Sequence, residues 1–385
     1  MNNAGFLDCF CHTLRACLTN LACAPFFLFA VAFYVFYYCW PYMAQLPLHL
    51  DAIVVDEDNS ALSRRMLASI QASPDYRIIR VSSNKTDAIR AMQSNEATCL
   101  IGIPANFEKD ALTGIPTSLW LITNGAFIVK ARTTMSGAAG VLENLANQAV
   151  QLELDLRGIP SSSQAREKAP ALVVKTMYNT ISGYLSFAVA IVFVIIFQTI
   201  MICGFAMLLN AWFSKADYPR PLQLALDSPM FMFAIQAPVL CICFFWSLFV
   251  EGFGFAWQGI NSFQNIPATL LVGIFFAWAV TALGLLLGLL FKTSKFAIHA
   301  VVMSSLPCVF ISGNLFAWQD IPSGLRMFAN LLPSTPGVDA MLRASQAGAD
   351  INEVFYYLLH LLALGAMYFI LANVLVHTAW WRARP

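Results

Sequence analysis

Four consecutive polar residues, Asp56-Glu57-Asp58-Asn59, form the densest group of potential metal ligands in the sequence. Ca²⁺ binds carboxylate and amide oxygens, and a twelve-residue calcium loop beginning at Asp56 would need glycine at its sixth position and glutamate at its twelfth. The chain has Ala61 and Leu67 at these positions. The spacing therefore favours another role, in which the acidic turn stabilises the N-terminus of a helix that begins at Ser60.

Signatures of the common enzyme classes do not occur in the sequence. It contains no HExxH zinc motif, no G-x-S-x-G nucleophile elbow and no GxxxxGK[ST] phosphate loop. The ten cysteines include no CxxC pair, and nine of them lie in or beside apolar stretches, so only Cys99 lies in the charged part of the chain. We therefore expect no catalytic, cofactor or metal site on this chain.

The composition indicates a membrane protein. Of the 385 residues, 59% are hydrophobic and only 11% are charged, whereas a soluble globular protein has roughly 25% charged residues. The net charge of +1 gives no sign of a nucleic-acid partner. Residues 176–214 contain no Asp, Glu, Lys, Arg or His. About 20 apolar residues at about 1.5 Å each cross a hydrocarbon core of about 30 Å, so this stretch is predicted to be the central membrane-spanning helix.

Hydropathy predicts six spans, five of which form a compact bundle over residues 176–385. A short amphipathic helix over residues 1–20 is expected to precede the first span and to lie at the membrane surface. Lys215–Asp227 and Glu251–Asn265 are predicted to be polar loops. The predicted spans are Leu21–Met43, the central stretch Thr176–Ser214, Ser228–Val250, Ile266–Phe291, Phe296–Phe316 and Val354–Trp380.

Residues 45–175 differ from the rest because they hold 13 basic and 13 acidic residues, more than half of the charges of the chain. Short β-branched runs alternate there with helical stretches, which predicts a small α/β domain with a partly parallel sheet. The predicted strands are Ala52–Val55, Arg77–Val81, Cys99–Ile103 and Ser118–Ile122. The fold class is therefore a mainly α-helical polytopic membrane protein with a small α/β domain between its first and second spans.

The basic residues of the short segments indicate the orientation. If both termini lie in the cytoplasm, seven of these residues are inside and only Arg326 and Arg343 are outside. This orientation makes residues 45–175 an external, periplasmic domain. The seven are Arg15, Lys215, Arg220, Lys292, Lys295, Arg382 and Arg384.

The predicted spans contain no Asp, Glu, Lys or Arg. Ion-coupled transporters generally keep such groups near the bilayer midplane, although each costs about 2.5–3.5 kcal/mol there. The energy for any transport is therefore expected to come from another chain. Gln198 and Thr199 in the central span are the first candidates for lining a pathway, and the alternative is that they only bond neighbouring helices.

The layout and several local patterns resemble the membrane subunits of type-2 ABC exporters, in the subgroup with a large external domain. The resemblance covers nearly the whole chain. The segments that carry it are Ile53-Val-Val-Asp-Glu-Asp-Asn-Ser60 with Ser63-Arg64, Ile101-Gly-Ile-Pro104 with Asn106-Phe107, Tyr178-Asn179, Gly183-Tyr184, Gln198-Thr199, Ser304–Pro307 with Ser312-Gly313, and Leu332-Pro-Ser-Thr-Pro336.

The resemblance implies the permease subunit of an ATP-driven exporter in a bacterial inner membrane, moving a hydrophobic or amphipathic, drug-like or lipid-like substrate. It implies no catalysis on this chain, because ATP and Mg²⁺ would be held by a separate ABC ATPase subunit. It also implies a second permease, either a copy or a paralogue, within membrane lipid. A periplasmic adaptor and an outer-membrane channel are optional further partners of such permeases.

One segment departs from the family pattern. The loop after the central span usually carries an E-R-E-x-G-T-like element near the ATPase, whereas this chain has Phe213-Ser-Lys-Ala-Asp-Tyr-Pro-Arg220 and lacks both glutamates. Lys215, Asp217 and Arg220 are the charged side chains that could dock on the ATPase, and the alternative is a solvated turn whose charges only set the topology.

The alternative function is a membrane-anchored receptor whose external domain binds a partner, although six spans exceed what anchoring needs.

Overall fold

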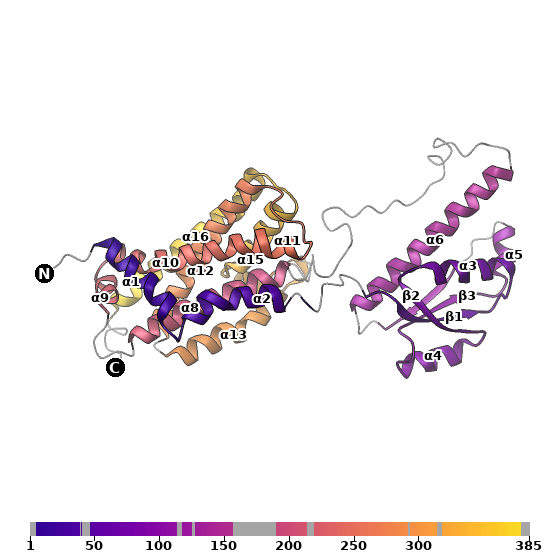
Figure 1. The fold of residues 1–385 in the computed structure, drawn as a ribbon, viewed down its shortest axis with the longest axis horizontal. Helices are drawn as coiled ribbons and strands as arrows, with labels where there is room; N and C mark the ends of the chain where they lie inside the picture. The colour runs from indigo at the N-terminus through magenta and orange to yellow at the C-terminus, as the bar shows by residue number, and fades with distance from the viewer. Residues whose placement is uncertain are drawn as a thin grey trace. The chain divides into compact units, whose positions relative to one another are not determined.

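The computed structural model divides the chain into two units, residues 44–175 and residues 1–43 with 176–385 (Figure 1). It describes residues 5–38, 40, 47–113, 118–124, 128–156, 190–213, 219–291, 293–313 and 318–378.

The unit over residues 44–175 contains a four-stranded mixed sheet in the order β2-β1-β3-β4. β1 is parallel to β2 and to β3, whereas β3 and β4 are antiparallel. The sheet is therefore partly parallel, as the alternation of strand-like and helix-like segments predicts. The strands are β1 (Leu50–Asp56), β2 (Tyr76–Ser82), β3 (Cys99–Ile103) and β4 (Trp120–Thr123).

Helices cover both faces of this sheet because its central strands are apolar on both sides. Ala52 and Val54 share one core with residues of α3 (Ala61–Ala72) and α6 (Ile128–Leu156). Ile53 and Val55 point to the opposite face, as the period of two along a strand requires, and share a second core with α4 (Lys85–Gln93). The short helix α5 (Phe107–Leu112) completes the unit.

Side-chain caps set where two of these helices begin. The Ser60 hydroxyl accepts a bond from the backbone N–H of Ser63 at 3.0 Å, and the Asn84 amide oxygen accepts one from Thr86 at 2.9 Å. Both caps satisfy backbone donors that the first helical turn leaves unpaired. Asp87, in the first turn of α4, lies 3.7 Å from Arg90 in an exposed ion pair.

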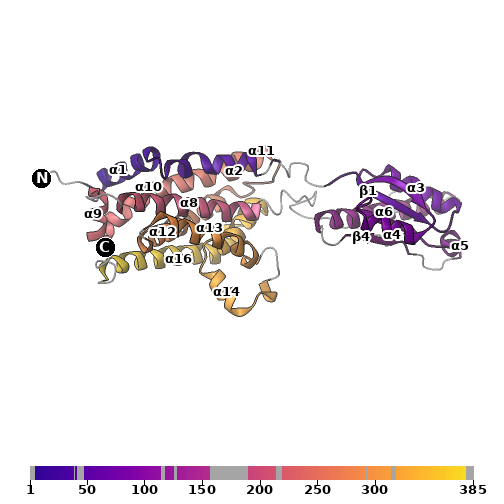
Figure 2. The same ribbon diagram turned by 90° about the horizontal axis from the view of Figure 1, so that it is seen from below.

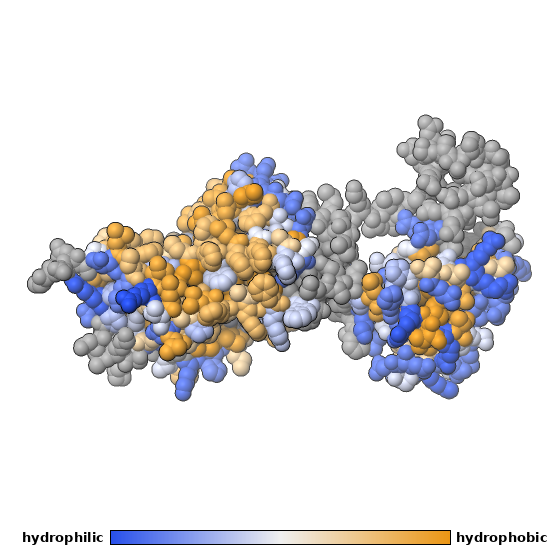
Figure 3. All heavy atoms as spheres, in the orientation of Figure 1, coloured by the Kyte–Doolittle hydropathy of each residue, from blue (hydrophilic) through white to orange (hydrophobic). Residues whose placement is uncertain are grey.

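The other unit is a helical bundle, and four of its helices are long and apolar enough to cross a membrane. Two further apolar helices are shorter, Phe26–Tyr37 and Lys295–Ile311, so the prediction of six spans stays a prediction. Figure 3 shows a largely apolar side of this bundle. The four long helices are α8 (Ala190–Phe213), α10 continued through the π-helical turn η4 and α11 (Pro229–Trp257), α12 (Ile266–Leu290) and α16 (Ile351–His377).

The helix α8 lies at the centre of the bundle, in contact with α12, with α13 (Ser294–Ile311) and with the π-helical turn η1 (Phe26–Ala30) (Figure 2). Glycines allow the close approach of α12. A Cβ atom at Gly284 would lie 3.3 Å from the Ile202 Cα, and one at Gly288 would lie 3.1 Å from the Ala206 Cα. Small residues therefore let the two backbones pack directly, as is common between helices in lipid.

Residues of the first predicted span are held to α10 and to Gln258, which follows α11, by two long-range hydrogen bonds. The Trp246 indole donates to the Phe27 carbonyl at 2.6 Å, and the Gln258 amide donates to the Val35 carbonyl at 2.6 Å. Phe27 belongs to η1 and Val35 to α2 (Val31–Tyr37). Before them lies α1 (Phe6–Thr19), which packs against α10 and corresponds to the amphipathic helix predicted over residues 1–20.

Two segments predicted to be loops are partly helical, so these predictions are wrong. Residues 251–257 continue α10 through η4 (Val250–Gly254) and α11 (Phe255–Trp257), although Gly252 and Gly254 weaken a helix. Arg220–Asp227 forms the helix α9, in which Pro221 occupies the first turn, where a missing N–H costs nothing. Leu222 and Ala225 bury one side of α9.

Candidate functional site

The two residues predicted to line a pathway differ in their surroundings. The Gln198 side chain is buried, with 5% of its residue surface exposed, and its Oε1 atom has no hydrogen-bond partner among the described residues. The Thr199 hydroxyl donates to the Ile195 carbonyl of the same helix at 2.8 Å. Gln198 therefore has an unused acceptor inside the bundle, while Thr199 is satisfied locally.

The position of Gln198 on α8 explains why it is buried. Residues 198, 202, 205 and 209 share one side of a helix, and Ile202 and Phe205 from this set contact α12 at Gly284. Gln198 thus lies on the side of α8 that packs against α12. Whether it lines a pathway stays a prediction.

The helix α15 (Ser334–Met341) brings two more buried hydroxyls close to α8, because it packs against both α8 and α12. Ser334 Oγ and Thr335 Oγ1 are buried and have no partner among the described residues. Both come from the Leu332–Pro336 motif of the sequence. A group of unsatisfied polar atoms on packed helices can bind the polar end of an amphipathic molecule, since each such atom gains a hydrogen bond on binding.

A hydrogen bond between α10 and α12 crosses the interior of the bundle. The Gln236 amide donates to Thr281 Oγ1 at 3.1 Å, and this hydroxyl donates in turn to the Ala277 carbonyl at 2.7 Å. Gln236 Oε1 and Asn210 Oδ1 remain without partners in the described part of the chain. The polar interior therefore consists mainly of uncharged amides and hydroxyls.

Glu251 is a buried acidic residue directly after the predicted span Ser228–Val250, and the observed helix extends beyond that span to include it. It lies in η4, within the continuous helix Pro229–Trp257, and only 3% of its surface is exposed. The Ser345 hydroxyl, in the π-helical turn η6 (Leu342–Gln346), donates to Glu251 Oε2. Ser345 Oγ also accepts the backbone N–H of Phe263 at 3.2 Å. A buried carboxyl without such donors would be costly, which explains the pairing.

Sequence reasoning missed this cluster for a clear reason. Glu251 follows an apolar run and precedes three glycines, a pattern typical of a loop. Its partner Ser345 lies 94 residues away in the sequence. Ser345 is one of many serines, so no local signal connects the two residues.

Of the three residues predicted to dock on an ATPase, Lys215 and Asp217 lie outside the described residues. Arg220 is exposed and is the first residue of α9. α9 packs against α10 and α1, so Arg220 lies at the end of the bundle where α1 begins. The amphipathic pattern Leu222, Ala225, Leu226 is the signal that could have identified this helix.

The acidic turn Asp56–Asn59 is used for internal hydrogen bonds. Asp56 accepts the backbone N–H groups of Asp58 and Asn59 through Oδ1 and the Ser63 hydroxyl through Oδ2, at 2.8 to 3.1 Å. Asp58 Oδ2 accepts the Glu108 N–H at 3.1 Å. These bonds tie the end of β1 to α3 and α5, in keeping with the predicted structural role of the turn.

Two comparisons with known proteins bear on the identity of the chain. A search of curated proteins finds no match. The family model described as ABC-2 family transporter protein matches residues 21–374, a range that includes parts of both units, three of the long apolar helices and most of the fourth. Since this match covers most of the sequence, the chain belongs to the family of ABC-2 transporter proteins.

Proposed function

We propose that this protein is the permease subunit of an ATP-driven exporter that moves a hydrophobic or amphipathic molecule, drug-like or lipid-like, across a bacterial inner membrane. The observation that carries the proposal is the family match over residues 21–374, together with four helices long enough to span a bilayer. Membership in this family implies a partner ABC ATPase subunit. ATP and Mg²⁺ then bind to that subunit and not to this chain.

The character of the bundle interior supports the proposed substrate class. Most of the buried polar atoms without partners in the described part of the bundle belong to uncharged side chains on α8, α10 and α15, and apolar residues of the bundle core lie on the same helices. Such an interior suits a molecule that is mostly apolar and carries a few polar groups. Gln198 and Thr199 are the proposed first contacts on the central helix.

The helix α9 is the proposed coupling element. It follows the central span, it is short and amphipathic, and two prolines at its start restrict its backbone. A stiff helix can transmit a push from a soluble ATPase to α10, against which α9 packs. Lys215, Asp217 and Arg220 are the proposed docking side chains. A second permease, and optionally an adaptor and outer-membrane channel, would complete the exporter.

The first experiment measures ATP hydrolysis in nanodiscs. We expect no hydrolysis above background with this chain alone, and hydrolysis once a partner ABC ATPase subunit is co-purified with it. Proteoliposomes of the complex, with ATP added outside, should then accumulate a lipophilic dye in the lumen. Hydrolysis by this chain alone, or a complex that never moves dye, would contradict the proposed division of labour.

The second experiment tests the coupling element. Replacing Lys215, Asp217 and Arg220 together with Ser should leave membrane insertion intact and reduce ATPase co-purification several-fold. The matched control replaces Lys85, Asp87 and Arg90 with Ser. These are one Lys, one Asp and one Arg, as in the test variant, and they lie in α4 of the other unit. If both triple variants retain the ATPase equally, Lys215, Asp217 and Arg220 do not dock on the ATPase.

A further inference from the structure

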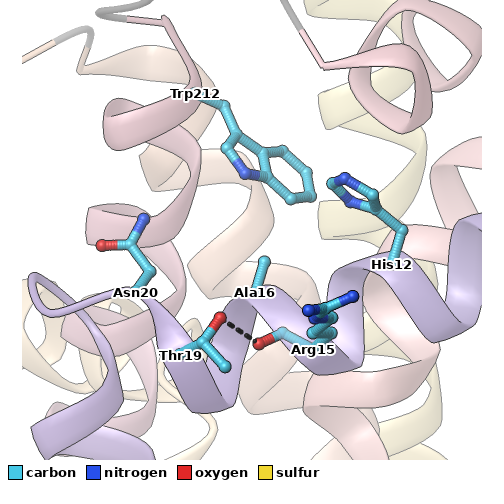
Figure 4. Close-up of a pocket in the computed structure, with 6 residues that line it drawn as sticks. All are labelled: His12, Arg15, Ala16, Thr19, Asn20 and Trp212. Atoms are coloured by element: carbon cyan, nitrogen blue, oxygen red, sulfur yellow. Dashed lines mark hydrogen bonds between the residues drawn. The ribbon is translucent and has the colours of Figure 1, made fainter.

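A cavity opens between α1 and the C-terminal end of α8. Its volume is about 390 Å³, within the usual range of small-molecule sites, which is about 300–1,000 Å³. Figure 4 shows the side chains that line it, which come from two helices that are distant in the sequence. The lining residues are His12, Arg15, Ala16, Thr19, Asn20 and Trp212.

The polar groups of this cavity are mainly hydrogen-bond donors. Arg15 is exposed, and its guanidinium makes no ion pair with the described residues. The Asn20 Oδ1 atom accepts the Ala22 backbone N–H at 3.0 Å, so the NH₂ group of that amide remains to donate. The Trp212 indole can only donate, and its ring lies 6.1 Å from that of His12.

The side chains that line the cavity offer few hydrogen-bond acceptors. Its lining includes no carboxylate. The Thr19 hydroxyl donates its proton to the Arg15 carbonyl at 2.8 Å, as the dashed line in Figure 4 marks. Asp8, the acidic residue of α1, accepts the Gly5 N–H at 3.0 Å, about two turns before Arg15. A site with several donors and a permanent cation fits an anion, and a guanidinium pairs with phosphate through two hydrogen bonds.

Exposed apolar side chains on α1 and just after it point to an anion that is attached to a hydrocarbon. Leu18 is 40% exposed and Leu21 is 92% exposed, and both lie next in sequence to lining residues. Leu7, on the same amphipathic helix, is 73% exposed. An amphipathic helix with exposed leucines is typical of the interface between lipid headgroups and acyl chains.

We infer that this cavity binds the phosphate of an anionic phospholipid, with Arg15, Asn20 and Trp212 as donors and the acyl chains lying along Leu18 and Leu21. The His12 ring lies beside the indole (Figure 4). Such binding would fix α1 to the membrane and to the end of the central helix at the same time. It goes beyond the proposed export activity and needs no ATPase, so its failure would leave that proposal untouched.

The test is native mass spectrometry of the purified full chain with didecanoyl-phosphatidylglycerol. Didecanoylglycerol, which has the same acyl chains and no phosphate, is the comparison lipid. We expect Arg15→Gln to weaken phosphatidylglycerol binding about tenfold, the loss of one charge-assisted hydrogen bond, and to leave didecanoylglycerol binding unchanged. Trp212→Phe keeps a buried ring, removes the N–H and should weaken phosphatidylglycerol binding by about threefold.

The matched control is Arg326→Gln, which removes a positive charge from the amphipathic helix α14 (Ser323–Asn330) without touching the cavity. It should bind both lipids like the parent protein. Equal phosphatidylglycerol affinity in the parent, Arg15→Gln and an Arg15→Gln/Asn20→Ala double variant would overturn the inference. Displacement of the lipid by an equimolar amount of inorganic phosphate would identify a site for free anions, and would also overturn it.

Discussion

The Ser345 hydroxyl donates a hydrogen bond to the buried carboxyl of Glu251, joining two helical segments that are 94 residues apart. The backbone N–H groups of Phe263 and Gln264 bond to the side chain and carbonyl of the same Ser345, at 3.2 and 2.9 Å. Three segments, η4, η6 and the chain before α12, therefore meet at one serine. This cluster closes one end of the helical bundle.

Glu251→Ala should destabilise the bundle, because it leaves the Ser345 hydroxyl buried without its acceptor. We expect a loss of about 1–3 kcal/mol in the free energy of unfolding. Glu251→Gln keeps an acceptor oxygen in the same place and should remain close to the parent. The midpoint of thermal unfolding in detergent measures both effects. Exposed Glu96→Ala is the control, and an equal loss in the Gln and Ala variants would mean that the negative charge, not the hydrogen bond, matters.

Gly288→Ala should also destabilise the bundle, because the new Cβ would lie 3.1 Å from the Ala206 backbone and 2.6 Å from Leu209 Cδ1. Separating α8 from α12 should cost about 1–3 kcal/mol. Gly140→Ala is the matched control, since no atom lies within 4 Å of a Cβ there. It lies inside the helix α6 and should stabilise that helix by about 0.5–1 kcal/mol. Thermal unfolding of the two variants should therefore shift in opposite directions.

The carboxyl of Asp58 should make the α/β unit sensitive to acid. The Ser60 hydroxyl, followed by the backbone N–H of Glu108, hydrogen-bonds the charged form and lowers the pKa of Asp58. A carboxyl with a lowered folded-state pKa contributes stability above its unfolded pKa of about 3.9, and loses it as the pH falls through the folded value. Asp58→Asn should therefore reduce the stability of the protein at pH 7. Below about pH 4, the stability of this variant should fall less steeply with decreasing pH than that of the parent. If the melting temperatures of variant and parent fall by the same amount between pH 7 and pH 3, this prediction is wrong.

Cys99 should be inert towards thiol reagents in the folded protein. Burial raises the pKa of its thiol to about 12, so almost no reactive thiolate exists at neutral pH. We expect no maleimide labelling of Cys99 at pH 7.5 in the native protein, and rapid labelling once the protein is denatured. The exposed Cys11 is the positive control on the same chain. Labelling of Cys99 at the rate of Cys11 would show that the α/β unit opens readily.

The inertness of Cys99 allows a test of the proposed orientation. In a Cys11→Ser/Cys39→Ser/Cys241→Ser background, a membrane-impermeant maleimide should label exposed Ser83→Cys in intact cells. It should label exposed Asp227→Cys only after the membrane is permeabilised. The reverse pattern would place residues 45–175 in the cytoplasm and would contradict the proposal that the protein is an exporter with an external domain.

The sequence by itself determined which segments are apolar enough to enter lipid and where the α/β unit lies. Hydropathy and the two-residue and 3.6-residue periods are local properties, so four long helices and all four strands were predicted close to their observed positions. The Ser60 and Asn84 caps were also predictable, because a cap acts within three residues. The acidic turn at Asp56 could be assigned a structural role for the same reason.

Only the tertiary structure decided which polar residues are paired and which are left with unused atoms. Glu251 accepts a hydrogen bond from Ser345, and the Gln236 amide donates one to Thr281. Arg15 shares its cavity with Trp212, which lies about 200 residues further along the chain. None of these partners can be identified from the neighbouring sequence. The energies of these contacts depend on distances between segments that the chain brings together only on folding. A buried carboxyl is costly without a donor and tolerable with one, and the sequence near Glu251 does not state which case applies.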